Sequence, residues 1–201
     1  MSLLSIKKKD KAFSVYEYGD YLGFIYKSDL DKIGLDKSEA DDIEVDDETI
    51  DKVKDIVKYH AFDKAVTYLK DFDRSAEDIK LKLRMKKYPD YAIEEAVKLL
   101  YEYNYLNDER FAESYIRAYM DQKSKSLILK ELSMKHVKVS YPDELIDRVY
   151  AEEDMTEDKA IARLMRRFEG RDMTDEKVRR RAASLLIRHG FSFEQINNHL
   201  T

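Results

Sequence analysis

The densest group of residues that could do chemistry is a run of basic residues near the C-terminal end of the sequence. It begins with RLMRRFEGR at Arg163 and ends with KVRRR at Arg181. Arginine presents a planar fork of N–H donors that matches phosphates and carboxylates, so the chemistry on offer is anion binding. At helical spacing Arg166 and Arg167 lie near the face of Arg163, and the next helix can add further arginines. A solvated helix face explains the same pattern equally well.

A second basic strip, KLKLRMKK, covers residues 80–87, where a solvated surface is the favoured interpretation. Two more arginines stand in the helical pattern of residues 105–120, whose other residues mostly indicate packing. These observations give one set of candidate residues for contact with an acidic protein surface or with DNA phosphates. The candidates are Arg163, Arg166, Arg167, Arg171, Lys177, Arg179, Arg180, Arg181, Arg188, Lys82, Lys86, Arg110 and Arg117.

The sequence contains no pattern typical of catalysis. Its four histidines form no HExxH or other close ligand pair, and YGDYLG lacks the pattern and the lysine of a phosphate loop. Cysteine is absent, so thiolate metal sites and disulfides are excluded. The acidic segment from Asp36 to Glu48 lacks the glycine and the ligand spacing of an EF-hand. We therefore predict a protein that is not an enzyme and uses no cofactor and no metal.

Composition predicts a chain that folds in the cytoplasm. It has 201 residues, of which 43% are hydrophobic and 39% charged, and no stretch approaches the ~18 apolar residues of a membrane span. The net charge is −5, which does not suggest a strongly basic nucleic-acid protein. Residues 156–201 nevertheless carry ten Lys and Arg against seven Asp and Glu, so this end is basic.

The first part of the sequence predicts β structure. Aromatic and β-branched residues flank Gly19-Asp20, which indicates a hairpin within residues 12–29. One helical turn ended by Gly34, an acidic loop and a short strand at residues 43–45 are expected to follow. Helical periodicity begins at Asp47, with a bend or break expected from His60 to Phe62.

The rest of the sequence repeats. Ala65, Ala112 and Ala160 stand 47 and 48 residues apart in similar helical patterns, and each is followed by two further amphipathic segments. Tyr88-Pro89-Asp90 recurs as Tyr141-Pro142-Asp143, where proline suits a first helical turn. The second copy carries about four extra residues within HVKVSY.

These patterns predict a mainly α protein, with tandem three-helix repeats stacked in an elongated or curved array behind a small N-terminal β-hairpin extension. The expected boundaries are residues 1–48 for the extension with its acidic loop, and 49–105, 106–154 and 155–201 for the three repeats.

Three segments carry a family resemblance. YLNDERFAESYIRAY, from Tyr105 to Tyr119, closely resembles the best-known motif of the RecX family of recombination regulators, in which a Leu and an Asp-rich start precede Arg-Phe-Ala on a helix. RSAEDIKLKLRMK resembles the R-S-x-x-E-L-x-x-K-L segment of that family, and LLIRHGFSFEQI resembles its R-R-G-F-S-x-x-x-I ending. The three segments occur in order within residues 60–201.

The resemblance implies a modular protein that binds the RecA recombinase filament on single-stranded DNA. Members restrain its ATPase, strand exchange and growth in recombination, DNA repair and the SOS response, and some also bind DNA. It therefore implies RecA as the partner, with weak direct DNA contact, no membrane and a monomeric chain. The sequence departs from the family where Lys-Gly often follows the second helix of a repeat. The matching places read Lys86-Lys87-Tyr88, His136-Val137 and His189-Gly190.

Two other functions remain open at this stage. The basic run would suit a helical DNA-binding module of helix-turn-helix type, although the net charge opposes it. A general helical-repeat scaffold for another protein would also explain the pattern.

Overall fold

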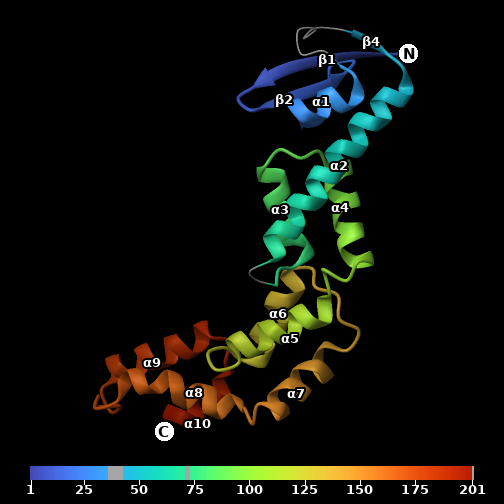
Figure 1. The fold of residues 1–201 in the computed structure, drawn as a ribbon. Coiled ribbons are helices and arrows are strands. Elements are labelled where there is room, and N and C mark those ends of the chain that lie inside the picture. The colour runs from blue at the N-terminus through green and yellow to red at the C-terminus, as the bar shows by residue number, and fades with distance from the viewer. Residues whose placement is uncertain (36–42, 71–72, 201) are drawn as a thin grey trace. The chain divides into compact units, whose positions relative to one another are not determined.

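The structure is a computed structural model that describes residues 1–35, 43–70 and 73–200. It divides into two compact units, Met1–Leu106 and Asn107–Thr201. Figure 1 shows that the described residues are mainly helical, with a small sheet at the N-terminal end, as the sequence predicts. The division into an N-terminal extension and three repeats, and the array they would form, stay predictions.

The first unit begins with a four-stranded antiparallel sheet. Its strands are β1 (Ser2–Lys9), β2 (Ala12–Glu17), β3 (Asp20–Tyr26) and β4 (Ile43–Val45), in the order β3-β2-β1-β4. The predicted hairpin is confirmed as β2 and β3, and the predicted short strand as β4. Strand β1 was missed: it forms a hairpin with β2 across Asp10-Lys11, a turn that lacks the glycine typical of two-residue hairpins, and it also pairs with the distant β4.

Four helices complete this unit, namely α1 (Lys27–Ile33), α2 (Asp47–Leu69), α3 (Ala76–Met85) and α4 (Asp90–Glu102). Helix α1 ends at Gly34, as predicted. The expected break from His60 to Phe62 is wrong, because α2 continues through it. Val57, Ala61 and Ala65 continue one fully buried stripe at helical spacing, and the His60 ring contacts the buried Asp29 carboxylate at 2.8 Å. Residues 36–42 of the predicted acidic loop lie outside the described residues.

One hydrophobic core holds the sheet against the helices of this unit. Leu4, Val15 and Ile25 of the sheet and Val53 and Val57 of α2 are all fully buried in it. Alternate residues of β2, Phe13 and Val15, are buried in this core. In β3 a register shift opposite Val15 and Tyr16 interrupts the alternation, so that Leu22 and Gly23 are both buried.

The second unit is helical throughout its described residues. Its elements are α5 (Asp108–Tyr119), α6 (Lys125–Met134), α7 (Pro142–Glu152), α8 (Glu157–Met165), the 3-10 turn η1 (Arg166–Phe168), α9 (Glu176–Arg188) and α10 (Phe193–Leu200). Asn107 caps α5 as its sequence predicts, since its side-chain oxygen accepts a hydrogen bond from the Arg110 N–H at 2.9 Å. Ser192 caps α10 in the same way through the Gln195 N–H. Ala112 and Ala160 are fully buried, as Ala65 is in the first unit.

Helices α3, α6 and α9 end alike. Each is followed by one residue of positive φ, and the next N–H then donates to the carbonyl five residues earlier at 3.2 Å. The positive-φ residues are Lys87, His136 and Gly190, with φ of 65°, 54° and 87°. The match to the family's Lys-Gly is therefore Lys135-His136, one residue earlier than the sequence comparison placed it.

His136 occupies a backbone conformation that favours glycine, so its replacement by glycine should affect stability. Replacement by glycine removes the steric cost of φ +54° at an exposed position, so H136G is expected to stabilise the second unit by about 1 kcal/mol. Lys130→Gly, inside α6, is the matched control and is expected to destabilise by about 1 kcal/mol. Urea unfolding of the two variants checks this, and a destabilised H136G would contradict the reading of this helix end.

None of the helices in the described parts of the chain combines the length and apolar character needed to cross a membrane.

Candidate anion-binding groove

A groove of about 410 Å³ lies between η1 and the C-terminal half of α9. Phe168 and Leu185 give it an apolar floor, and Leu185 is buried in the core of the second unit. Four candidate arginines stand around this floor, all of them exposed: Arg167, Arg180, Arg181 and Arg188. The fold thus brings together arginines that are up to 21 residues apart in the sequence. We call this site the arginine groove.

Most of these arginines are available to a ligand. Arg180 pairs with Glu176 on its own helix, and the Arg188 Nε–H donates to the Ser184 carbonyl at 3.4 Å. Within the described part of the chain, Arg167, Arg181 and Arg188 have no carboxylate partner. An apolar floor beside unpaired guanidinium groups suits a ligand that carries carboxylates or phosphates next to apolar groups, because arginine binds such anions through two parallel hydrogen bonds.

Other predicted residues of the basic run lie outside the lining of the arginine groove. Arg163 on α8 pairs with Asp121 at 3.2 Å. The remaining ones are exposed at η1, in the following loop and at the start of α9: Arg166, Arg171, Lys177 and Arg179. The sequence could not separate these from the groove arginines, because the turn over residues 169–175 decides which of them face η1.

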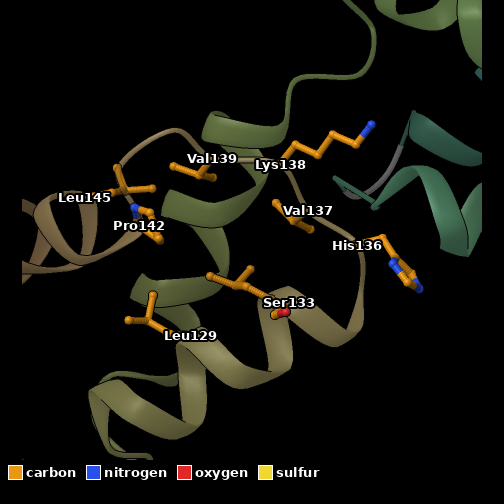
Figure 2. A pocket seen from close by; sticks show the side chains of 9 residues that line it. Leu129, Ser133, His136, Val137, Lys138, Val139, Pro142 and Leu145 are labelled. Carbon is orange, nitrogen blue, oxygen red and sulfur yellow. The ribbon is translucent and has the colours of Figure 1, made fainter.

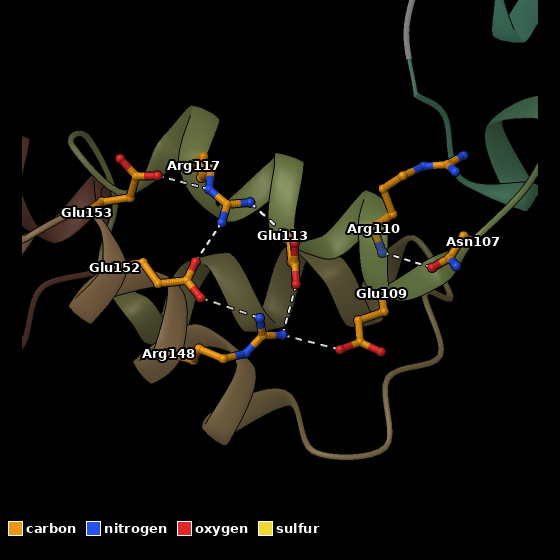
Figure 3. A network of polar contacts seen from close by, with 8 residues as sticks. All are labelled: Asn107, Glu109, Arg110, Glu113, Arg117, Arg148, Glu152 and Glu153. Carbon is orange, nitrogen blue, oxygen red and sulfur yellow. Dashed lines mark hydrogen bonds and ion pairs between the residues drawn. The ribbon is translucent and has the colours of Figure 1, made fainter.

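Arg117 is engaged inside the protein. Figure 3 shows its guanidinium between α5 and α7, where it reaches Glu152 at 2.7 Å, Glu153 at 3.0 Å and Glu113 at 3.3 Å. Arg148 of α7 joins the same network through Glu113 at 2.8 Å. This network holds α7 on α5, so its arginines are structural.

Two further points follow from the same network. Arg110 extends away from it in Figure 3, and its backbone N–H takes part in the helix cap. Arg148 was missed by the sequence reasoning, because it stands alone in α7 and its partners Glu109 and Glu113 lie on another helix.

The carboxylate of Glu113 has a lowered pKa in this network. Its partial burial disfavours the charged form, but hydrogen bonds from Arg148 and Arg117 outweigh that effect and hold the pKa below its ordinary value. A pKa lowered by folding stabilises the protein above the ordinary glutamate pKa of about 4.3, and this stabilisation is lost as the pH falls through the lower folded value.

This gives a prediction for Glu113→Gln. The variant loses charged hydrogen bonds to two arginines and is expected to be about 1 kcal/mol less stable at pH 7. Its difference from the parent is expected to shrink as the pH falls below about 4, where the parent's carboxylate also becomes protonated. Urea unfolding at both pH values tests this, and a difference that does not change with pH would contradict it.

The basic strip of α3 belongs to the first unit. Lys82 places its ammonium 5.3 Å from the ring centroid of Tyr68, a cation–π contact. Lys86 lies at the end of α3 and lines a separate groove beside the sheet.

A further pocket of about 370 Å³ lies between α6 and the start of α7, around the extra residues of HVKVSY. Figure 2 shows Leu129, Val139 and Leu145 around it, while Lys138 and His136 extend outward. Its walls are largely apolar, so the pocket adds nothing to the anion chemistry of the arginine groove.

The described residues contain no cluster of three or more potential metal ligands among His, Asp and Glu. Three of the four histidines make contacts within the fold, with Asp29 (His60), the Gln122 carbonyl (His189) and Asp158 (His199).

Fold and site together define a mainly helical protein with a basic groove on its C-terminal unit. Comparison with known proteins gives the family. The chain is 33% identical over 143 residues to regulatory protein RecX of Vibrio vulnificus, an alignment that covers 69% of this chain and 90% of that protein. It is 31% identical over 140 residues to regulatory protein RecX of Bacillus velezensis, covering 68% of this chain and 52% of that one. The chain belongs to the RecX family of regulatory proteins.

A solved structure supports the fold. A crystal structure of a regulatory protein RecX superimposes with a TM-score of 0.56 over 98% of both chains, at 20% identity. No family model matches the chain. The chain spans about half the length of the Bacillus and Geobacillus relatives that it matches. RecX proteins are regulatory and not enzymes, in agreement with the sequence prediction.

Proposed function

We propose that this protein binds the RecA recombinase filament on single-stranded DNA and inhibits its ATPase, strand exchange and growth. It acts by contact, as a monomer in the cytoplasm, and performs no reaction itself. Its helices would bridge neighbouring recombinase subunits and hinder the motions that ATP turnover requires. Membership of the RecX family supports the choice of partner.

The observation that carries the proposed contact is the arginine groove. Arg167, Arg181 and Arg188 surround an apolar floor without a carboxylate partner among the described residues. A protein surface with acidic side chains beside an apolar one would pair with these arginines and cover Phe168 and Leu185. Removing or reversing one partner of such a pair is expected to cost more than at an ordinary surface ion pair, because the other charge would be left buried and unpaired in the complex.

Filament binding is tested directly with a fluorescently labelled chain. We expect the labelled chain to bind RecA filaments, assembled with a non-hydrolysable ATP analogue, at least about tenfold more tightly than the same bare strand, and to lose affinity as salt rises. Equal affinity for the bare strand would favour the helical DNA-binding module instead. Absence of filament binding would leave the general scaffold as the function.

A further inference from the structure

A second groove, of about 700 Å³, lies on the outward face of the sheet in the first unit. Its floor carries three aromatic residues, Tyr16, Tyr21 and Phe24, from β2 and β3. Lysines of the turn between β1 and β2 stand on one side, and Lys86 and Lys87, which follow helix α3, stand on the other. We call this site the aromatic groove, and nothing in the proposed contact of the arginine groove uses it.

Sheet register places the aromatic side chains on one face. Tyr16 pairs with Tyr21 across β2 and β3, and Ser14 pairs with Phe24, so these side chains project from the same face of the sheet. The rings of Tyr16 and Tyr21 have centroids 5.5 Å apart. Lys7 of β1 places its ammonium 5.3 Å from the Tyr16 centroid. The face is therefore a row of rings edged by positive charge.

The walls of the aromatic groove are fixed to each other. The Tyr21 hydroxyl donates to the Lys87 carbonyl at 3.1 Å, which ties β3 to the turn after α3. Phe24 packs on the buried Tyr88 with ring centroids 4.9 Å apart. Both walls lie in one compact unit, so the groove is formed before a ligand arrives.

Charge selects the kind of ligand. Lys9, Lys11, Lys86 and Lys87 line the groove and are exposed, and none has a carboxylate partner within the described residues. Asp10 is the one acidic residue of the lining. Four lysines against one aspartate give the groove a local charge of +3, although the whole chain has a net charge of −5. Such a local positive charge attracts a polyanion.

We propose that the aromatic groove binds single-stranded DNA, with bases stacked on Tyr16 and Tyr21 and phosphates beside the lysines. Single strands bind proteins through this combination of a basic groove and aromatic platforms. A proline-rich peptide would use the rings but leave the lysines without a function, and a duplex keeps its bases stacked inside. The choice of DNA over RNA rests on the proposed function, in which the recombinase itself is assembled on single-stranded DNA.

The test measures fluorescence anisotropy of a labelled oligothymidylate strand titrated with the full chain, without recombinase. The parent is expected to bind with a salt-dependent affinity. K9E/K11E is expected to bind at least about tenfold more weakly and to reduce the slope of log K against log salt by about 1.4, since each lysine contributes about 0.7 on a single strand. The control K27E/K130E changes the charge equally outside the groove and should bind like the parent.

Stacking is tested at one ring. Y16A is expected to lose at least about fivefold in affinity, while Y16F, which keeps the ring, binds like the parent. Circular dichroism confirms that each variant is folded, and if Y16A does not fold, the lysine variants decide. Unchanged binding by K9E/K11E overturns the proposal. Equal or tighter binding of oligouridylate overturns the assignment to DNA.

The test of single-strand binding and the test of the proposed function can fail independently of each other. K9E/K11E changes only the aromatic groove, and its inhibition of RecA is measured beside its DNA binding. If the chain binds the strand but does not affect RecA, the proposed function fails and this inference on single strands stands. If the chain inhibits RecA but does not bind the bare strand, this inference fails alone.

Discussion

The double variant R167E/R181E is expected to inhibit RecA ATPase at least about tenfold more weakly than the parent. Both arginines line the arginine groove and lack a carboxylate partner among the described residues. In the parent, both arginines would attract an acidic surface of the partner. Charge reversal makes both contacts repulsive and leaves the apolar floor of Phe168 and Leu185 in place. Both side chains are exposed, so the fold should be retained. ATP hydrolysis on single-stranded DNA, titrated with each protein, measures the effect.

A matched control distinguishes the effect of the groove arginines from the effect of the overall positive charge of the C-terminal end. R171E/R179E makes the same change of net charge close by in the same unit, outside the lining of the groove. It is expected to inhibit RecA nearly as well as the parent. Equal losses in the two variants would show that total charge, and not the groove, makes the contact.

Gly190→Ala is expected to destabilise the second unit by about 3 kcal/mol. Gly190 has φ +87°, which is unfavourable for alanine. An added Cβ would also lie 2.5 Å from the Ser124 Oγ and 2.5 Å from the Leu127 Cβ. The Ser124 hydroxyl donates to the Gly190 carbonyl at 2.8 Å and caps α6, so the turn after α9 cannot move away without losing this contact.

Gly170→Ala is the matched control for this prediction. Its φ is +74°, but an added Cβ has nothing within 4 Å, so only the backbone cost of about 1 kcal/mol applies. Urea unfolding of both variants gives the comparison. Equal losses would contradict the close packing of the turn after α9 against the start of α6.

Most of the helices could be predicted from the sequence, because apolar periodicity and caps such as Asn107 and Ser192 are local signals. The predicted break in α2 was wrong because His60 and Phe62 do not interrupt a helix whose buried stripe continues through Ala61, the residue between them. Strand β1 could not be predicted with equal ease, since the Asp10-Lys11 turn that joins it to β2 lacks a glycine, and its other neighbour, β4, lies some forty residues away.

The basic run was predicted as a site, but the sequence could not show which of its residues line the arginine groove and which lie outside it. Arg167 and Arg181 meet at one groove only because the chain turns over residues 169–175, between η1 and α9, and no periodicity shows that turn. Arg117 pairs with Glu152 and Glu153 only because α7 packs on α5. The structural role of Arg117 therefore could not be predicted from the sequence. The aromatic groove escaped notice because it joins β2 and β3 to the turn after α3.

The most direct test of the central claim is ATP hydrolysis by RecA on single-stranded DNA, with this protein added below the concentration of RecA. We expect hydrolysis to fall steeply at such doses, because one bound chain bridges several subunits of the filament and hinders all of them. Hydrolysis that stays unchanged, even when the protein is added in excess over RecA, would contradict the proposed function.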